Sequence, residues 1–176
     1  MRSRGGLNHH HGRKFDVPSG TEEAILADDG SFTAGFRLGY PYDRTVGPTL
    51  SRFFRGLAEC RIEGTVGSDG RVYVPPAEFD PVTGDALTEW RTCASVGSVE
   101  TWSWQSEPGD HHRIGRPFAW ALIRLDGADV PMLATVDAMS PDAMTTGMRV
   151  SVRWATERVG SIHDISCFVP CTEETV

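Results

Sequence analysis

Short stretches in which apolar and polar residues alternate fill the second half of the chain, and they limit its fold more than any other feature. Residues 148–155 alternate most clearly, with apolar side chains at every second position and arginine or serine between them. Further strands are predicted at residues 96–104, 118–127, 130–138 and 165–170. An Asp-Gly pair at residues 126–127 predicts a tight turn between two of them. Five or six short strands at this spacing predict a small closed β-barrel.

The predicted strand at residues 96–104 contains two tryptophans. Strict alternation would place Val99 on the same face as Thr101 and Ser103, with Trp102 and Trp104 on the opposite face. One face of this strand is therefore expected to carry both indole rings.

A short helix is predicted before the strands, over residues 48–58. Pro48 suits the first helical position, and the apolar residues of the segment fall on one helical face. Phe53 and Phe54 are adjacent aromatic residues, more than so short a helix needs to bury. Packing in the protein's own core is the simpler interpretation, and docking to a partner is the alternative. Earlier in the chain, residues 1–20 are polar and predict a loose arm, whereas residues 32–42 predict a strand or hairpin.

Residues 67–84 have the turn residues of a two-knuckle zinc ribbon. Gly70 and Gly84 stand where the knuckle glycines belong, and Pro75-Pro76 form the step between the knuckles. The four ligand positions are occupied by Val66, Asp69, Asp80 and Thr83. Structural zinc is held by thiolate or imidazole groups, and this set contains neither. We therefore predict a degenerate ribbon whose turns, closed by Asp69 and Thr83 side chains, persist without metal.

Charge and length exclude several classes of function. The net charge of −7 and a pI near 5.3 argue against nucleic acid as a partner. No apolar run approaches the roughly 18 residues of a membrane helix, so no membrane is expected. The four cysteines form no C-x-x-C pair, which predicts reduced thiols and a cytoplasmic location. They are Cys60, Cys93, Cys167 and Cys171.

The residues that could carry chemistry do not form an evident active site. His111 and His112 lack a third ligand at useful spacing, which argues against a metal site. His163 precedes Asp164, but neighbouring residues on an extended chain point to opposite faces. Cys167 is predicted to be a small buried hydrophobe within a strand. An independent hydrolase or hydratase acting through His163 or His112 is the third hypothesis for this chain.

Six segments in the right order resemble the acyl-CoA-associated zinc-ribbon/OB-fold family, whose members pair with thiolases and lipid-transfer-type thiolase relatives. The resemblance spans roughly residues 48–170, and its segments are FFRGLAECRI, GRVYVPP, VGSVETWSW, RPFAWALIRLDGAD, TTGMRVSVRW and CFVP. It implies a mainly β protein with a five-stranded OB-fold barrel, preceded by a short helix and a metal-free, rubredoxin-like ribbon. The expected parts are an N-terminal arm (1–46), the helix with the ribbon (47–94) and the barrel (95–176). Because the ligands differ, zinc is not carried over.

The resemblance further implies a non-catalytic accessory subunit in a hetero-oligomer with a thiolase-fold, lipid-transfer-type enzyme. That enzyme would act on acyl-CoA thioesters, with C–C cleavage such as steroid side-chain retro-aldol or thiolysis as the expected reaction. A stand-alone acyl-CoA-binding module is the alternative. No cofactor is expected on this chain itself, although a coenzyme A thioester could be shared with the partner.

Two sets of residues are candidates for these roles. Guanidinium groups suit bidentate contacts with phosphate, so contacts to the coenzyme A phosphates are assigned to Arg113, Arg116 and Arg124. The candidate partner interface consists of Phe53, Phe54, Arg71, Tyr73, Pro75, Pro76 and Phe79. No catalytic residue and no metal ligand is assigned.

Overall fold

The computed structural model describes residues 45–171 and two short strands before them, β1 (Ile25–Leu26) and β2 (Phe32–Thr33). The chain divides into two compact units, residues 1–45 and 46–176. In the first unit β1 pairs antiparallel with β2. The strand or hairpin predicted at residues 32–42 is therefore described only at its start, and the predicted arm lies outside the described residues. In the second unit, the ribbon-like segment and the barrel form one body.

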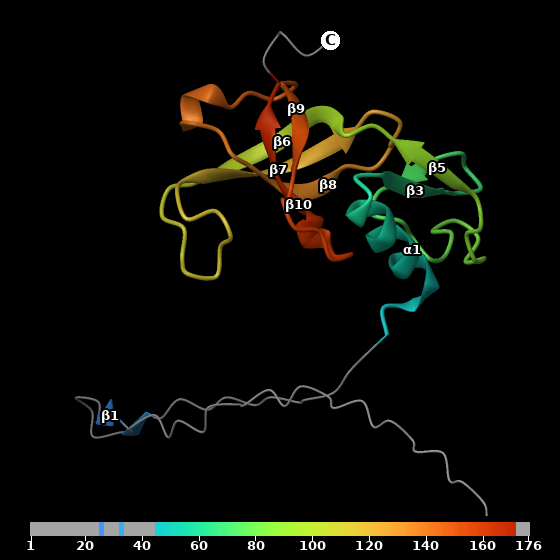
Figure 1. Ribbon diagram of the computed structural model, residues 1–176, viewed down its shortest axis with the longest axis horizontal. Helices are drawn as coiled ribbons and strands as arrows, with labels where there is room; N and C mark the ends of the chain where they lie inside the picture. Colours follow the sequence, from blue (N-terminus) through green and yellow to red (C-terminus); the bar gives the residue numbers. More distant parts are fainter. Residues whose placement is uncertain (1–24, 27–31, 34–44, 172–176) are drawn as a thin grey trace, which may run out of the picture. The chain divides into compact units, whose positions relative to one another are not determined.

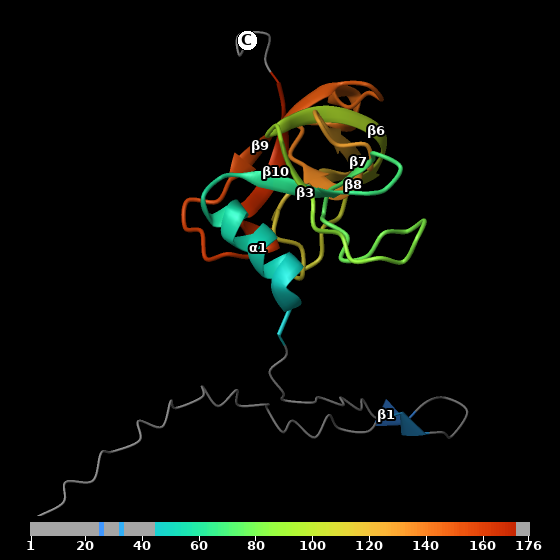
Figure 2. The same ribbon diagram turned by 90° about the vertical axis from the view of Figure 1, so that its right-hand side faces the viewer.

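A closed five-stranded barrel dominates this second unit (Figures 1 and 2). Its strands are neighbours in the order β10-β8-β7-β6-β9. Every pairing is antiparallel except that of β10 with β8, which is parallel and closes the barrel. The predicted mainly β fold with an OB-type barrel is thereby confirmed. The strands are β6 (Val96–Gln105), β7 (Phe118–Leu125), β8 (Met132–Val136), β9 (Arg149–Trp154) and β10 (Ile165–Pro170).

A small second sheet and one helix lie beside the barrel (Figure 1). The sheet has the order β4-β3-β5, with β4 at Val72–Tyr73, β3 at Ile62–Val66 and β5 at Trp90–Cys93. The helix α1 (Gly47–Ala58) begins with Pro48 in its first turn, as predicted, and contacts β3. Phe53 and Leu57 face inward, where Phe53 is only 1% exposed. The expectation that Phe53 is available to a partner was therefore wrong: its position on the helix directs it into the core.

A bulge in β6 changes which residues share a face. The register between β6 and β7 shifts between Val99 and Thr101. An extra residue in one strand reverses the side-chain alternation beyond it. As a result Trp102 and Trp104 pack against the same core as Val99, rather than facing away from it. The strict alternation expected at residues 96–104 was wrong for this reason.

The barrel interior is filled by alternate residues of β7 and β8. Ala119, Ala121, Ile123 and Leu125 are almost completely buried, so the residues between them face outward. Two 3-10 helices, η1 (Pro141–Ala143) and η2 (Ile162–Asp164), lie in the connections before β9 and β10. In the described part of the chain, no helix has both the length and the apolar character needed to span a membrane.

Candidate functional site

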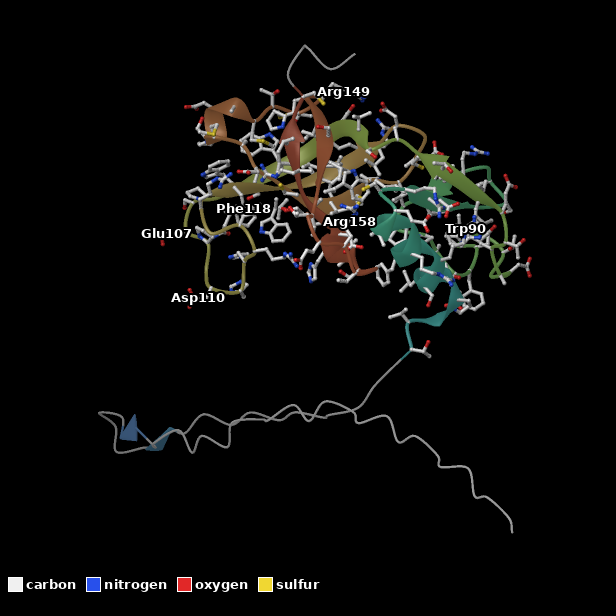
Figure 3. The ribbon with its side chains drawn as sticks, viewed as in Figure 1. Trp90, Glu107, Asp110, Phe118, Arg149 and Arg158 are labelled. Atoms are coloured by element: carbon white, nitrogen blue, oxygen red, sulfur yellow. The ribbon has the colours of Figure 1, made fainter. Side chains whose placement is uncertain are left out.

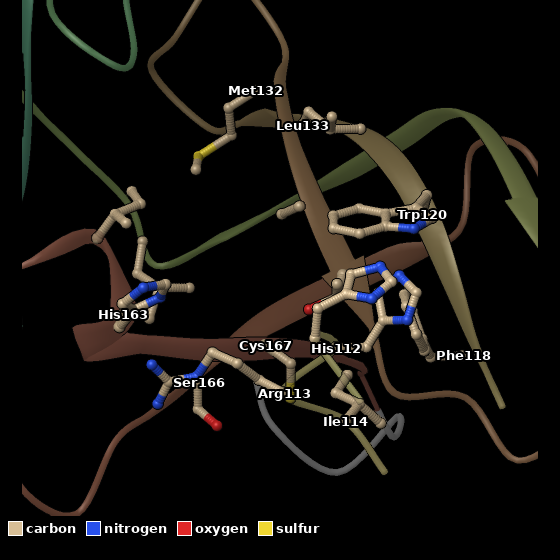
Figure 4. Close-up of a pocket in the computed structure, with 15 residues that line it drawn as sticks. His112, Arg113, Ile114, Phe118, Trp120, Met132, Leu133, His163, Ser166 and Cys167 are labelled. Carbon is tan, nitrogen blue, oxygen red and sulfur yellow. The ribbon is translucent and has the colours of Figure 1, made fainter. Parts of the chain in front are cut away.

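A cavity of about 430 Å³ is lined by residues of β7, β8 and β10. Its walls are the segment Ser106–Pro117, called here the 106–117 loop, and η2. Figure 4 shows His163 on one side of the cavity and His112 with Trp120 on the other. Cavities of 300–1,000 Å³ are typical of small-molecule sites. This cavity is therefore the candidate ligand site of the chain.

Aromatic rings from the loop and from β7 form one wall of the cavity. Phe118 and Trp120 occupy outward positions of β7 and pack edge to face, with ring centroids 5.4 Å apart. The His112 ring covers Phe118, with centroids 5.3 Å apart, and His111 stacks on His112. Phe118 is thus buried although it points away from the barrel interior. The 106–117 loop is held against the barrel by these ring contacts.

The ionisable side chains at the cavity rim are an arginine and three histidines, which can carry positive charge and donate hydrogen bonds. His111, His112, Arg113 and His163 line it, and no carboxylate does. The Gly109 N–H donates to Nδ1 of His112 (2.8 Å), so a neutral His112 carries its proton on Nε2. No ion pair to Arg113 is recorded within residues 45–171. Sequence reasoning named Arg113 and both loop histidines without placing them at one cavity.

Carboxylates near the cavity are engaged elsewhere. Both Arg116 and Arg153 form ion pairs with the buried Asp137. Burial would raise the Asp137 pKa, but the hydrogen bonds from Arg153 and Arg116 outweigh it and hold the pKa below its usual value. Figure 3 shows Glu107 and Asp110 on the outer side of the loop, away from the barrel. The cavity lining itself therefore contains one arginine and three histidines but no carboxylate.

The structure gives no support to catalysis by His163 or Cys167. The Asp164 carboxylate accepts backbone N–H bonds from Val159, Gly160 and Ser161, which places it in the capping box of η2 and not beside the His163 ring. Cys167 is 1% exposed, and burial raises the pKa of its thiol, so the nucleophilic thiolate is disfavoured. The prediction that Cys167 is a small buried hydrophobe is confirmed.

The ribbon-like segment keeps its turns but its ligand positions do not fit zinc. Val66 is a buried apolar residue of β3. Asp69 accepts a hydrogen bond from the Arg71 N–H (3.0 Å) and Thr83 one from the Asp85 N–H (3.3 Å), which are the turn closures that the sequence predicted. Among the described residues, no group of three or more histidine, cysteine or acidic side chains could hold a metal ion.

Asp80 joins the two knuckles, a role that the sequence did not reveal. One carboxylate oxygen accepts the Ser68 N–H of the first knuckle (2.6 Å), and the other accepts the Val82 N–H of the second (2.7 Å). These donors, first that of Ser68 and then that of Val82, lower the pKa of Asp80. The carboxylate thereby makes the cross-connection between knuckles that a zinc ion makes in a liganded ribbon.

The predicted interface residues differ in exposure. Phe79 is 57% exposed, Arg71 and Pro75 are exposed, and Tyr73 and Phe54 are half-buried. Pro76 is buried like Phe53, so neither presents a surface to a partner. Val82, which is 67% exposed and follows Phe79 by three residues, was missed, although an apolar residue in a polar turn is a visible signal.

The three arginines assigned to coenzyme A do not converge. Arg124 pairs with Glu100 (3.0 Å), and Arg116 pairs with Asp137. Arg113 alone lines the cavity. The six residue steps from Phe118 to Arg124 along β7 span roughly 20 Å, so Arg124 lies at the far end of that strand.

The closed five-stranded barrel with its appended ribbon has the architecture of an OB-fold protein. Residues 90–155 match the family model described as "ChsH2, C-terminal OB-fold domain". Residues 90–155 of this chain are therefore similar to that OB-fold domain, in agreement with the resemblance found in the sequence. The match begins at β5 and ends just after β9.

Two solved structures are similar in fold. The Ltp2–ChsH2(DUF35) aldolase contains a chain with 16% identity and a TM-score of 0.54, and the alignment covers 74% of this chain and 100% of that one. A DUF35-family protein of unknown function from Sulfolobus solfataricus has 20% identity and a TM-score of 0.49, with 61% of this chain and 77% of that one covered. No curated protein matches this chain.

Proposed function

We propose that this chain is a non-catalytic accessory subunit that docks onto and completes a thiolase-fold, lipid-transfer-type enzyme acting on acyl-CoA thioesters. The observation that carries the proposal is the match of its barrel to the ChsH2 OB-fold domain. A chain of similar fold is part of an aldolase together with Ltp2. The partner would supply the catalytic residues for C–C cleavage, by retro-aldol reaction or thiolysis.

The docking surface that we propose is the ribbon, through its exposed residues Arg71, Pro75, Phe79 and Val82 and the half-buried Tyr73. Phe79 and Val82 stand on either side of Asp80, whose hydrogen bonds hold the backbone of both knuckles. An aromatic anchor on a fixed backbone loses little conformational entropy on binding. The ribbon would then present a preformed apolar contact.

The test is co-expression of the full chain with the thiolase-fold protein encoded by a neighbouring gene. Size-exclusion chromatography should show one complex, and its C–C cleavage activity should exceed that of the partner alone. Separate elution with no gain in activity contradicts the proposal.

Two variants locate the docking surface. The double variant Phe79→Asp/Val82→Asp should elute apart from the partner, because it places charge in the apolar contact. Met139→Asp is the matched control: Met139 is 92% exposed but lies after β8, outside the ribbon. If the double variant still forms the complex, another surface makes the contact.

A stand-alone acyl-CoA-binding module is the second candidate, and the cavity favours it. Of the three arginines that could meet coenzyme A phosphates, Arg113 is the one at the cavity. Calorimetry with the isolated chain distinguishes the two candidates, since an accessory subunit needs its partner to bind acyl-CoA tightly.

A further inference from the structure

We infer that the cavity beneath the 106–117 loop binds a small anionic amphiphile, with its apolar chain or ring against β7 and β8 and its anionic end at Arg113. The inference does not depend on the accessory role proposed above. It rests on the lining of the cavity and on the charges at its rim.

The body of the cavity suits an apolar group. Trp120, Leu133 and Ile162 surround its mouth, and each remains exposed although it is large and apolar. Leu133 is 63% exposed at the outward position of β8, opposite Leu122 of β7. Removing such an exposed apolar cluster from water is favourable, so a ligand that covers it gains binding free energy. Figure 4 shows Leu133 and Met132 on the same side of the cavity, above Cys167.

The rim suits an anion. Arg113 reaches the cavity without an ion-pair partner in the part of the chain that the structure describes, in contrast to Arg116, Arg124 and Arg153. The only titratable side chains beside it in the lining are histidines and a buried thiol. A guanidinium with free donors binds a carboxylate or phosphate in a bidentate fashion. A cationic head group would be repelled by Arg113, and no carboxylate in the lining would offset that repulsion.

Three probes of equal chain length test the charge preference: decanoate, decanol and decyltrimethylammonium, each titrated into the full chain by calorimetry. Decanoate should bind most tightly and the ammonium compound least. Chemical shift changes on addition of decanoate should map to β7, β8, β10 and the 106–117 loop. Equal affinity for the three probes, or no binding of decanoate, overturns the inference.

Variants at two positions separate the anion contact from the apolar contact. Arg113→Gln should weaken decanoate binding about tenfold, as expected for loss of a charged hydrogen bond, and leave decanol within twofold. Arg91→Gln is the control, because Arg91 is an exposed arginine of β5 outside the cavity. Leu133→Glu should weaken decanoate more than Leu133→Gln does, since only the former adds negative charge at the mouth. If Arg113→Gln changes all probes equally, the anion is not held there.

The anion can come from a free acid or from a coenzyme A thioester, and further titrations distinguish these sources. Decanoyl-CoA binding more tightly than decanoate identifies the thioester, and the reverse identifies the free acid. Coenzyme A alone binding as well as decanoyl-CoA, with no effect of Leu133→Glu, contradicts an apolar site. Failure of the chain to bind any amphiphile would leave complex formation with a thiolase-fold partner unaffected, so the two proposals fail separately.

Discussion

Asp80 and Asp137 are two buried carboxylates that the chain stabilises in different ways. Asp80 accepts backbone N–H groups from two turns, whereas Asp137 is neutralised by Arg116 and Arg153. Burying a carboxylate costs free energy unless donors replace the lost water. Both side chains therefore fix neighbouring segments in place, and substitutions at Asp80 and at the arginines of Asp137 should measure how much stability each contributes.

Asp80→Asn should lower the melting temperature at neutral pH. Both carboxylate oxygens accept backbone N–H groups. In asparagine one of these oxygens is replaced by an NH2 group, which is a donor and would point at an N–H donor. Asp85→Asn is the matched control, because it removes the same charge from an exposed residue of the same turn. Thermal unfolding followed by circular dichroism measures both. An equal effect of the two variants would contradict the role of Asp80 between the knuckles.

The contribution of Asp80 should disappear in acid. Its folded pKa is lowered by the Ser68 and Val82 N–H donors, so the folded protein binds this proton less readily than the unfolded chain. The stabilisation is complete above the unfolded pKa of about 4 and is lost as the pH falls through the lower folded pKa. The melting-temperature difference between wild type and Asp80→Asn should shrink over that window. A difference that stays constant there contradicts the assignment.

Substituting both arginines that pair with Asp137 should lower the free energy of unfolding by more than the sum of the two single substitutions. Arg116→Ala and Arg153→Ala should each cost about 1 kcal/mol, because the remaining arginine still pairs with the buried carboxylate. The double variant should exceed that sum by about 1 kcal/mol or more. Urea denaturation measures this cycle. Arg124→Ala, which breaks the exposed pair with Glu100, should cost about 0.5 kcal/mol.

At the scale of elements, the barrel depends on close backbone contact where β6 crosses its neighbours. A Cβ at Gly97 would lie 2.4 Å from the Arg124 carbonyl oxygen, a backbone atom that cannot rotate away. Gly97 is also paired with Leu125 of β7 and Val150 of β9. This one position therefore sets how tightly three strands approach one another.

Gly97→Ala should destabilise the chain by about 3 kcal/mol, the upper end of the range for overpacking. Gly115→Ala is the control, since no atom lies within 4 Å of a Cβ there, and it should change stability by less than about 0.5 kcal/mol. Denaturant unfolding compares the two variants. Similar stabilities would show that β6 can move away from β7 at little cost.

The ribbon should hold no metal. We predict less than stoichiometric zinc by elemental analysis after purification without chelator, because the ligand positions offer no thiolate or imidazole. Addition of a chelator should leave the melting temperature unchanged. Stoichiometric zinc in the purified chain would overturn this prediction.

The sequence predicted elements whose signals are local and missed features that depend on distant partners. Pro48 indicated the start of α1, and Asp126-Gly127 indicated the β7–β8 hairpin. The pairing of β3 with β5 was missed, because it joins residues separated by the whole ribbon. The bulge at β6 was missed because alternation gives no sign of an inserted residue.

Of the residues that line the cavity, the sequence assigned only Arg113 to a ligand, and it did not predict the cavity itself. Asp80 was noted only as a non-ligand, since its donors at Ser68 and Val82 become neighbours only when both turns form. The FAWALI run offered one signal for the cavity. Apolar residues at both odd and even positions of a strand predict that its outward face is covered too, and Phe118 with Trp120 lie under the 106–117 loop.

At the scale of the whole molecule, the ribbon and the barrel belong to one compact unit that begins at Val46. A chain of residues 46–176 should fold by itself and melt within a few degrees of the full chain, because the described core residues of that unit all lie between Phe53 and Phe168. Circular dichroism and calorimetry measure this. A large loss of stability in the shortened chain would show that residues 1–45 contribute to the fold.

Arg158 illustrates how this unit is held together. Its side chain donates to the Ala58 carbonyl at the end of α1 (2.9 Å) and to the Ala155 carbonyl after β9. Figure 3 shows it between the barrel and α1. A single side chain thus ties the helix to the barrel, across 100 residues of sequence.

The parallel pairing of β10 with β8 has a consequence for synthesis on the ribosome. β10 is the last of the barrel strands to be made, and it lies between β8 and β9, which are made earlier. Until residues 165–170 leave the exit tunnel, β8 and β9 have unpaired edges, and such edges invite pairing with other nascent chains. Cys167 and Ser166 are also absent from the cavity until that moment. The growing chain is therefore most exposed to misassembly before β10 emerges from the ribosome, and the cavity is completed in that last step.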